Sequence, residues 1–371
     1  MAQASKGAFL CARVVALWAV LLVFSVGDGL GIDAVGLEPE VPRRVMTFYY
    51  PWYGIPDGPG GAGRMVHWRQ VDPAKRDIAA STHYPTLGAY DSHDAKLIEQ
   101  HCKWAVGAGI DTFIVSWWGH GSYSDRAMKV ILDGCHRHKL KVCIYYETVP
   151  RPQTAESAVR DILKVLEKYA RHKAYLKVAG QPVVFVYGRT LREIGLDEWA
   201  RAAKLLDERY RGGVALIGDR FKADAAAVFD GLHTYNIAGA LRDKGLAEVR
   251  EWVSRTYPSW VKLAERAGKI STVTVIPGYD DTKIRKPGLV VRRFGGELYR
   301  VQWQAAIAAK PRWILITSFN EWHEGSEIEP SFEHGKLYLE LTAEFAGRFK
   351  AGSRAVPRRP ELSADETGLR K

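Results

Sequence analysis

Residues 313–329 read WILITSFNEWHEGSEIE, an apolar stretch that runs directly into a segment crowded with acidic and aromatic side chains. Ile314, Leu315 and Ile316 form a continuous apolar run, which is typical of a strand buried on both faces. Residues 113–115, Phe-Ile-Val, repeat the pattern. Strands of this kind indicate a parallel sheet that is covered by helices.

Runs of the same type recur along the chain and alternate with amphipathic stretches. The eight predicted strands are Val45–Tyr49, Thr112–Ser116, Val142–Tyr146, Val183–Val186, Val214–Ile217, Gly231–Thr234, Thr272–Ile276 and Trp313–Thr317. The predicted helices are Asp94–Ala108, Ser124–His136, Ala155–His172, Leu196–Tyr210, Ala247–Ala267 and Glu297–Ala309. This alternation predicts a single α/β domain, a (β/α)8 TIM barrel over residues 45–348. A doubly wound open sheet is the alternative, although no glycine-rich phosphate-binding fingerprint follows the first strand.

Composition excludes several classes of protein. The 371 residues are 47% hydrophobic and 26% charged, which excludes a disordered chain, a collagen and a disulfide scaffold. The formal net charge is +11, but the basic residues are scattered and no nucleic-acid-binding motif accompanies them. We therefore expect no nucleic-acid partner, and an attraction to acidic glycans or cell surfaces is open.

The first 30 residues resemble an export signal. Lys6 and Arg13 precede an apolar run, Val14–Val26, which as a helix would span about 20 Å, short of the ~30 Å hydrocarbon core. An exported protein with no other membrane contact is expected, and an uncleaved signal anchor is the alternative. Residues 349–371 are expected to form a flexible basic tail. We expect a monomer.

The cysteines and histidines do not form a recognisable metal site. Cys11 lies in the N-terminal segment, and Cys102, Cys135 and Cys143 remain, with no zinc-type spacing. No H-E-x-x-H sequence is present either, so we expect no metal and no cofactor. Three buried thiols, or one disulfide with a thiol left over, are both open.

Aromatic and polar residues gather where the predicted strands end, and in a barrel the chemistry lies at the carboxyl ends of the strands. These stretches are residues 49–54 (YYPWYG), 116–119 (SWWG), 145–147 (YYE), 235–236 (YN), 277–281 (PGYDD) and 318–329. Aromatic rings that stack on the C–H faces of pyranose rings, with a few polar groups for the hydroxyls, are typical of a sugar cleft.

Glu321 and Glu324 are the candidate catalytic pair. Hydrolysis of a glycosidic bond uses one carboxyl that is protonated and a second that is ionised. Side chains three residues apart on a continuing strand would point to opposite faces, so the pair requires a turn at Trp322-His323. Burial against Trp322 and repulsion from ionised Glu321 would keep Glu324 protonated.

The chain contains only two asparagines, Asn236 and Asn320, and each follows a predicted strand end. Their positions beside Tyr235 and Glu321 suggest hydrogen-bonding roles in the site. The turn preference of asparagine explains them equally well.

Four stretches together resemble glycoside hydrolase family 99, the endo-α-1,2-mannosidases and endo-α-1,2-mannanases. They are residues 48–54 (FYYPWYG), 66–68 (VHW), 278–282 (GYDDT) with Arg285, and 316–325 (ITSFNEWHEG). The resemblance covers about residues 45–345. It implies a metal-free barrel that cleaves internal α-mannosidic bonds of mannans or N-glycan-type glycans with retention. In that family the 2-hydroxyl of the sugar attacks its own anomeric carbon, which gives a 1,2-anhydro sugar.

The resemblance also implies roles for individual residues. Glu321 would be the base for the 2-hydroxyl, and Glu324 would be the acid and then the base. Contacts to an α-mannose-containing oligo- or polysaccharide would come from Tyr53, His67, Trp117, Trp118, Glu147, Tyr235, Arg285 and Asn320. The second Trp of Trp117-Trp118 resembles bacterial mannan-degrading members, whereas vertebrate-type members carry Tyr, and residues 237–245 also differ from the vertebrate loop.

Two other functions remain open. A barrel of polysaccharide biosynthesis resembles this chain in an N-E-W-x-E-G motif, but x is typically Ala there rather than His323, and an exported N-terminus argues against that role. A non-catalytic carbohydrate-binding barrel would need the aromatic platforms but not the pair Glu321 and Glu324.

Overall fold

The computed structural model describes residues 41–352. It contains all eight predicted strands, each within a few residues of the expected bounds. They are β1 (Arg44–Tyr49), β4 (Thr112–Trp117), β5 (Lys141–Tyr146), β7 (Gln181–Val186), β8 (Ala215–Asp219), β9 (Gly231–His233), β10 (Thr272–Val275) and β13 (Trp313–Ile316). All of them are parallel, in the spatial order β10-β13-β1-β4-β5-β7-β8-β9, so their carboxyl ends share one edge.

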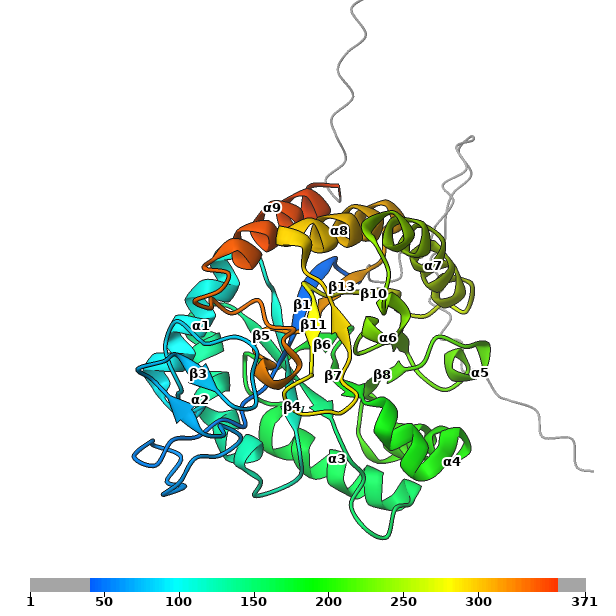
Figure 1. Ribbon diagram of the computed structural model, residues 1–371. Helices are drawn as coiled ribbons and strands as arrows, with labels where there is room; N and C mark the ends of the chain where they lie inside the picture. The colour runs from blue at the N-terminus through cyan, green and yellow to red at the C-terminus, as the bar shows by residue number, and fades with distance from the viewer. Residues whose placement is uncertain (1–40, 353–371) are drawn as a thin grey trace, which may run out of the picture. The chain divides into compact units, whose positions relative to one another are not determined.

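The sheet closes between β9 and β10, and side chains complete this seam. Backbone hydrogen bonds cross it at Ile270: the Leu232 amide donates to the Ile270 carbonyl at 3.3 Å, and the Ile270 amide donates to the Asp230 carbonyl at 2.9 Å. The Thr272 hydroxyl donates to the Leu232 carbonyl at 2.7 Å, and the Thr274 hydroxyl donates to the Thr234 carbonyl at 2.5 Å. The predicted (β/α)8 barrel is therefore confirmed, and the open-sheet alternative is wrong (Figure 1).

Alternation along the strands divides the core into two parts. Met46 and Phe48 of β1 point into the barrel, where they pack among Ile114, Tyr145 and other inward side chains. Val45 and Tyr49, the residues before and after this pair, belong to the layer between barrel and helices. This alternation decides which residues near a strand end can reach the mouth of the barrel.

Helices surround the strands (Figure 1). Six match the predicted stretches: α1 (Ala95–Gly107), α2 (Tyr123–Arg137), α3 (Ala155–Tyr169), α4 (Gly188–Arg209), α7 (Leu246–Arg266) and α8 (Glu297–Ala309). Side-chain caps fix the starts of the first three, because Asp94, Ser122 and Thr154 each accept a hydrogen bond from a backbone amide of the first turn.

A further long helix, α9 (Leu337–Ala351), follows β13 and was not predicted. It buries apolar residues at helical spacing, including Tyr338, Leu341 and Phe345. Because α9 continues to Ala351, the expected domain end at 348 and the tail start at 349 were placed too early. Residues 353–371 and the predicted N-terminal segment 1–30 lie outside the described residues.

The remaining elements of the described residues are short. Two small hairpins, β2 (Val71–Asp72) with β3 (Asp77–Ile78) and β11 (Tyr279–Asp280) with β12 (Val290–Val291), lie in the connections after β1 and β10. The others are β6 (Lys177–Val178), α5 (Ala223–Ala226), α6 (Ala238–Leu241) and the 3-10 turns η1 (Phe294–Gly296) and η2 (Trp322–Glu324). Within residues 41–352, no helix is long and apolar enough to cross a membrane.

The three cysteines of the described region are buried free thiols. The sulfur atoms of Cys102 on α1 and Cys135 on α2 lie 3.7 Å apart, in hydrogen-bond contact. Burial raises the pKa of Cys135 and Cys143 well above the ordinary thiol value. Of the two alternatives left by the sequence, the structure contains free thiols.

Candidate active site

A cavity of about 450 Å³ opens at the carboxyl ends of the barrel strands. Both candidate catalytic residues line it, together with five of the predicted substrate contacts. The full lining is Tyr50, Trp52, His67, Trp118, Ser122, Tyr123, Ser124, Tyr145, Glu147, Tyr187, Arg189, Tyr235, Arg285, Glu321 and Glu324. The barrel mouth is therefore an aromatic hollow with carboxyl groups and two guanidinium groups in its wall.

The turn that the pair of glutamates requires is present. The Glu321 amide donates to the Ser318 hydroxyl at 2.8 Å, which pulls the chain out of the strand direction. The Glu321 carboxylate then accepts a hydrogen bond from the His323 amide at 3.2 Å and so caps turn η2. Because the chain winds into a 3-10 turn here, Glu321 and Glu324 both line the cavity rather than facing apart.

Gly325 ends this turn in the left-handed region, at φ +54°. A Cβ atom at this position would lie 3.0 Å from the Thr82 hydroxyl and 3.1 Å from backbone atoms of Asp280. Both the backbone conformation and the close approach of β11 therefore require glycine directly after Glu324.

Glu324 is held by a cation and by a phenol. The Tyr235 hydroxyl donates to Glu324 Oε2 at 3.0 Å, and Arg285 Nη2 lies 3.2 Å from Glu324 Oε1. Arg285 is itself fixed, because its Nη1 contacts Asp281 at 2.5 Å and the Tyr279 hydroxyl at 2.8 Å. Burial raises the pKa of Glu324, and Arg285, Tyr279 and Tyr235 partly oppose that shift.

Glu321 has less support for a negative charge. Burial and the neighbouring charge of Glu324 raise its pKa well above the ordinary carboxyl value, and the His323 amide opposes the shift. The sequence argument invoked burial of Glu324 against Trp322, but Trp322 is not among the residues that line the cavity. Trp322 points away, and its indole N–H donates to the Tyr90 hydroxyl at 3.0 Å.

Glu147 lies across the cavity at the end of β5. The Ser116 hydroxyl donates to its carboxyl at 2.7 Å, and the Trp118 indole N–H donates to the same hydroxyl at 2.9 Å. Burial raises the pKa of Glu147 to about 8, against the opposing effects of Ser116 and Arg189. Glu147 is therefore largely protonated at pH 7, and it can donate a hydrogen bond to a ligand.

His67 forms one aromatic wall of the cavity. Its ring stacks on Trp52, with ring centroids 4.4 Å apart and an interplanar angle of 11°. Burial, and to a smaller extent the neighbouring Arg69, lowers the pKa of His67 to about 4, so the ring is neutral at pH 7.

Three predicted substrate contacts do not line the cavity. Trp117 is fully buried on the outer face of β4, where its indole N–H donates to Asp125 at 2.9 Å. Strand alternation is the reason: Ser116 points inward, Trp117 points outward, and Trp118 reaches the mouth because it follows the strand end.

Asn320 and Tyr53 are buried beneath the cavity floor. The Asn320 amide accepts from the Tyr50 amide at 2.8 Å and donates to the Tyr50 carbonyl at 3.1 Å, which extends the pairing of β1 with β13. The Tyr53 hydroxyl donates to the Asn320 carbonyl at 3.2 Å and accepts from the Trp322 amide at 3.1 Å. Asn236 caps α6 by accepting from the Ala238 amide at 3.2 Å. The asparagines thus serve backbone geometry.

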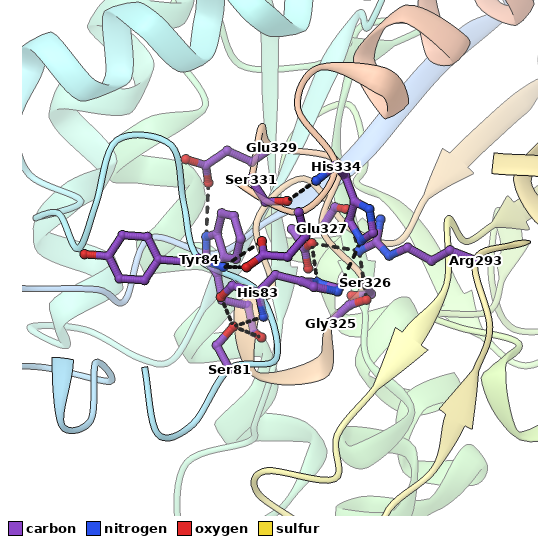
Figure 2. Close-up of polar contacts among 12 residues, drawn as sticks. Ser81, His83, Tyr84, Arg293, Gly325, Ser326, Glu327, Glu329, Ser331 and His334 are labelled. Atoms are coloured by element: carbon purple, nitrogen blue, oxygen red, sulfur yellow. Dashed lines mark hydrogen bonds and ion pairs between the residues drawn. The ribbon is translucent and has the colours of Figure 1, made fainter. Parts of the chain in front are cut away.

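The other two carboxylates of this segment have structural partners. Glu329 accepts from Tyr90 at 2.8 Å and contacts His101 at 3.1 Å, and it is fully buried. Glu327 forms ion pairs with Arg293 at 2.7 Å and His83 at 2.8 Å (Figure 2). Only Glu321 and Glu324 of the four are left facing a space that a ligand can enter.

A buried cluster braces the catalytic turn from behind. Arg293 Nη2 donates to the Gly325 carbonyl at 2.9 Å and to the Glu327 carbonyl at 3.0 Å (Figure 2). The Ser81 hydroxyl donates to the Trp322 carbonyl at 2.9 Å. Turn η2 is therefore held on both sides by side chains from other parts of the chain.

Sequence comparison assigns the family. The family model described as glycosyl hydrolase family 99 matches residues 41–339, most of the chain. The chain belongs to glycoside hydrolase family 99. As a glycoside hydrolase it is an enzyme that cleaves glycosidic bonds, and Glu321 and Glu324 both line the cavity at the barrel mouth.

Relatives of this family 99 enzyme include bacterial and animal proteins. A solved structure titled as the GH99 endo-α-mannosidase from Bacteroides thetaiotaomicron is 27% identical, has a TM-score of 0.70, and covers 84% of this chain and 99% of its own. Glycoprotein endo-α-1,2-mannosidase of Rattus norvegicus is 28% identical over 85% of this chain and 77% of its own length. A human protein named glycoprotein endo-α-1,2-mannosidase-like is 27% identical over 82% of this chain and 75% of its own.

Several cavity residues were not predicted individually. Tyr50, Trp52 and Tyr145 lie in stretches already noted at strand ends, but alternation and the turn after β1 decided which rings face inward. Tyr187 and Arg189 directly follow β7, so the same strand-end rule that identified the others also applies to them.

Proposed function

We propose that this enzyme is a retaining endo-acting α-mannosidase that hydrolyses internal α-mannosidic bonds of mannan or N-glycan-type glycans. The observation that carries the proposal is that Glu321 and Glu324 line one aromatic cavity, with Glu324 contacting Arg285 and Tyr235. The names of the family 99 relatives support the α-mannoside substrate. Trp118 in the cavity wall supports a mannan-type substrate.

The proposed first step breaks the glycosidic bond. The Glu321 carboxylate removes the proton from the 2-hydroxyl of the mannose, whose O2 attacks the anomeric carbon to close a 1,2-anhydro ring. The bond from the anomeric carbon to the leaving oxygen breaks, and Glu324 donates its proton to that oxygen. This step requires Glu321 ionised and Glu324 protonated, and burial, which raises the pKa of both carboxyl groups, favours a proton on the pair.

The second step opens the anhydro ring. Glu324, now ionised, removes a proton from water, whose oxygen attacks the anomeric carbon. The O2–C1 bond breaks, and O2 takes back the proton held by Glu321. Two inversions at the anomeric carbon give net retention.

Substitution of each glutamate by glutamine tests the proposal. The Glu321→Gln and Glu324→Gln variants keep shape and lose proton transfer, so turnover of α-linked mannose oligomers should fall by about 10³-fold or more while glycan binding changes little. Glu340→Gln, on the exposed face of α9, is the matched control and should retain full turnover.

Product analysis identifies the bond that is cut. Reducing-end release from α-1,2-, α-1,3- and α-1,6-linked mannose oligomers should show internal cleavage of at least one of them, with the α-anomer released first. Wild-type turnover in either glutamine variant contradicts the catalytic assignment, and no cleavage of any oligomer contradicts the substrate class.

We also propose that the protein is exported by residues 1–30 and acts as a monomer. Cell fractionation with mass spectrometry of the mature N-terminus tests export and separates a cleaved signal from an anchor. Recovery of the chain in the cytoplasm with Met1 or Ala2 at its N-terminus contradicts it.

A further inference from the structure

Arg189 lines the cavity but has no place in the chemistry proposed above. It follows β7 and lies in the first turn of α4, on the side of the cavity that also contains Trp118 and Glu147. Its guanidinium carbon lies 4.7 Å from the centroid of the Trp118 ring and 5.9 Å from that of Tyr187. Stacking on a ring restrains a guanidinium group and leaves its N–H donors free for other partners.

The charge of Arg189 has no direct partner in the described part of the chain. Within residues 41–352 it forms no hydrogen bond and no ion pair, whereas Arg285, the other cavity arginine, contacts both Asp281 and Glu324. Arg189 is half-buried, so part of its hydration has been removed without replacement.

No carboxylate of residues 41–352 forms an ion pair with Arg189. Glu147 is the carboxyl of this part of the cavity, and burial keeps it largely protonated at pH 7. Asp219 lies behind the start of α4, where it accepts a hydrogen bond from the Gly188 amide at 3.1 Å. The N-terminal turn of a helix is also the unfavourable end for a cation. A positive charge here costs stability unless a ligand compensates it.

We propose that Arg189 and Trp118 form a subsite for an anionic substituent, a phosphate or a carboxylate, on a sugar of the bound glycan. The proposal rests on the proposed function, because it assumes that the cavity takes an α-mannoside. Trp118 stacks on the sugar face, and the guanidinium edge donates two parallel hydrogen bonds to the anionic oxygens. The net charge of +11 favours the approach of such an acidic glycan.

Calorimetric titration tests the subsite. The Glu324→Gln chain, which should bind without cleaving, is titrated with an α-mannose oligosaccharide, its 6-phosphorylated counterpart and a uronate-bearing counterpart. We expect at least one anionic ligand to bind about tenfold more tightly than the neutral one at 50 mM NaCl, and this preference to shrink at 500 mM.

Substitutions in the same background assign the preference to one side chain. Arg189→Gln should abolish the preference while the neutral ligand loses less than about threefold, and Arg189→Lys should retain part of it. Arg192→Gln, which removes an exposed charge from the next turn of α4, is the matched control and should retain the full preference.

Three results would overturn the subsite: equal affinity for all three ligands, an equal loss for all of them in Arg189→Gln, or the same effect from Arg192→Gln. Turnover of neutral mannan by the wild-type enzyme is measured in parallel. If neutral mannan is cleaved but no anionic preference is found, only the subsite is wrong. If no mannoside is cleaved but the phosphorylated ligand binds through Arg189, the subsite stands and the proposed reaction is wrong.

Discussion

Four glutamates within nine residues, 321 to 329, perform different tasks because their partners differ. Glu327 is paired with Arg293 and His83, and Glu329 is enclosed by Tyr90 and His101. Glu321 and Glu324 have an open side toward the cavity. Residue type alone therefore says little about catalysis here. A structural carboxyl has its hydrogen bonds and ion pairs supplied by the protein. A reactive carboxyl has an open side where a ligand can bind.

Arg285 should set the acidity of Glu324. Its charge lowers the pKa of Glu324 against the effect of burial, so Arg285→Gln should raise that pKa. Because Glu324 must be protonated to act as the acid, the alkaline limb of kcat/KM should move to higher pH by about one unit. A pH profile on an α-mannose oligomer measures the shift. Lys283→Gln, in the same loop, should leave the limb in place, and an alkaline limb that stays fixed in Arg285→Gln would contradict the acid role.

At the scale of elements, the apolar runs predicted all eight strands because buried parallel strands are apolar on both faces. The strand-end rule also located the cavity. The rule could not distinguish adjacent residues. Trp117 and Trp118 are the same residue type, yet Trp117 packs in the core and Trp118 lines the cavity. Asn320 was misassigned because an amide that pairs with the Tyr50 backbone looks, in sequence, like one that binds sugar.

The brace behind turn η2 should be visible in both stability and turnover. In Glu327→Gln the nearly buried Arg293 loses its counter-charge, which should lower the free energy of unfolding by about 3 kcal/mol. Gly325 is then held less firmly, so kcat should fall more than KM rises. Denaturant unfolding and steady-state kinetics measure the two effects. The double variant Arg293→Met, Glu327→Leu should recover stability but not kcat, and recovery of both would show that the brace positions nothing.

The stabilisation that the ionised Glu327 provides should depend on pH in a defined direction. Burial raises the pKa of Glu327, but Arg293 and His83 outweigh it, so the pKa in the fold is lower than the ordinary 4.5. The stabilisation is therefore complete above pH 4.5 and is lost as the pH falls through the folded-state pKa. The stability difference between wild type and Glu327→Gln should shrink below pH 4.5, and a difference that grows in acid would contradict the ion pair.

At the scale of the whole molecule, the barrel closes where its backbone pairing is poorest. Between β9 and β10 the threonine hydroxyls of residues 272 and 274 supply hydrogen bonds that a regular ladder would provide. The seam could not be predicted from the sequence, because Thr272 and Thr274 are also ordinary strand residues. The seam matters for function, since Tyr235, which contacts Glu324, lies just beyond β9.

Thr272→Val tests the seam with little change in shape. The variant leaves the buried Leu232 carbonyl without the hydroxyl that donates to it at 2.7 Å, so the free energy of unfolding should fall by about 1–2 kcal/mol. Residue 272 begins β10, at the far end of the barrel from the cavity, so kcat should stay within about twofold of wild type. Thermal unfolding and turnover are measured together, with the half-exposed Thr256→Val on α7 as the control. An unchanged melting temperature would mean that the threonine side chains do not stabilise the seam. A loss of turnover that matches the loss of stability would mean that barrel closure at the seam is coupled to the contact between Tyr235 and Glu324.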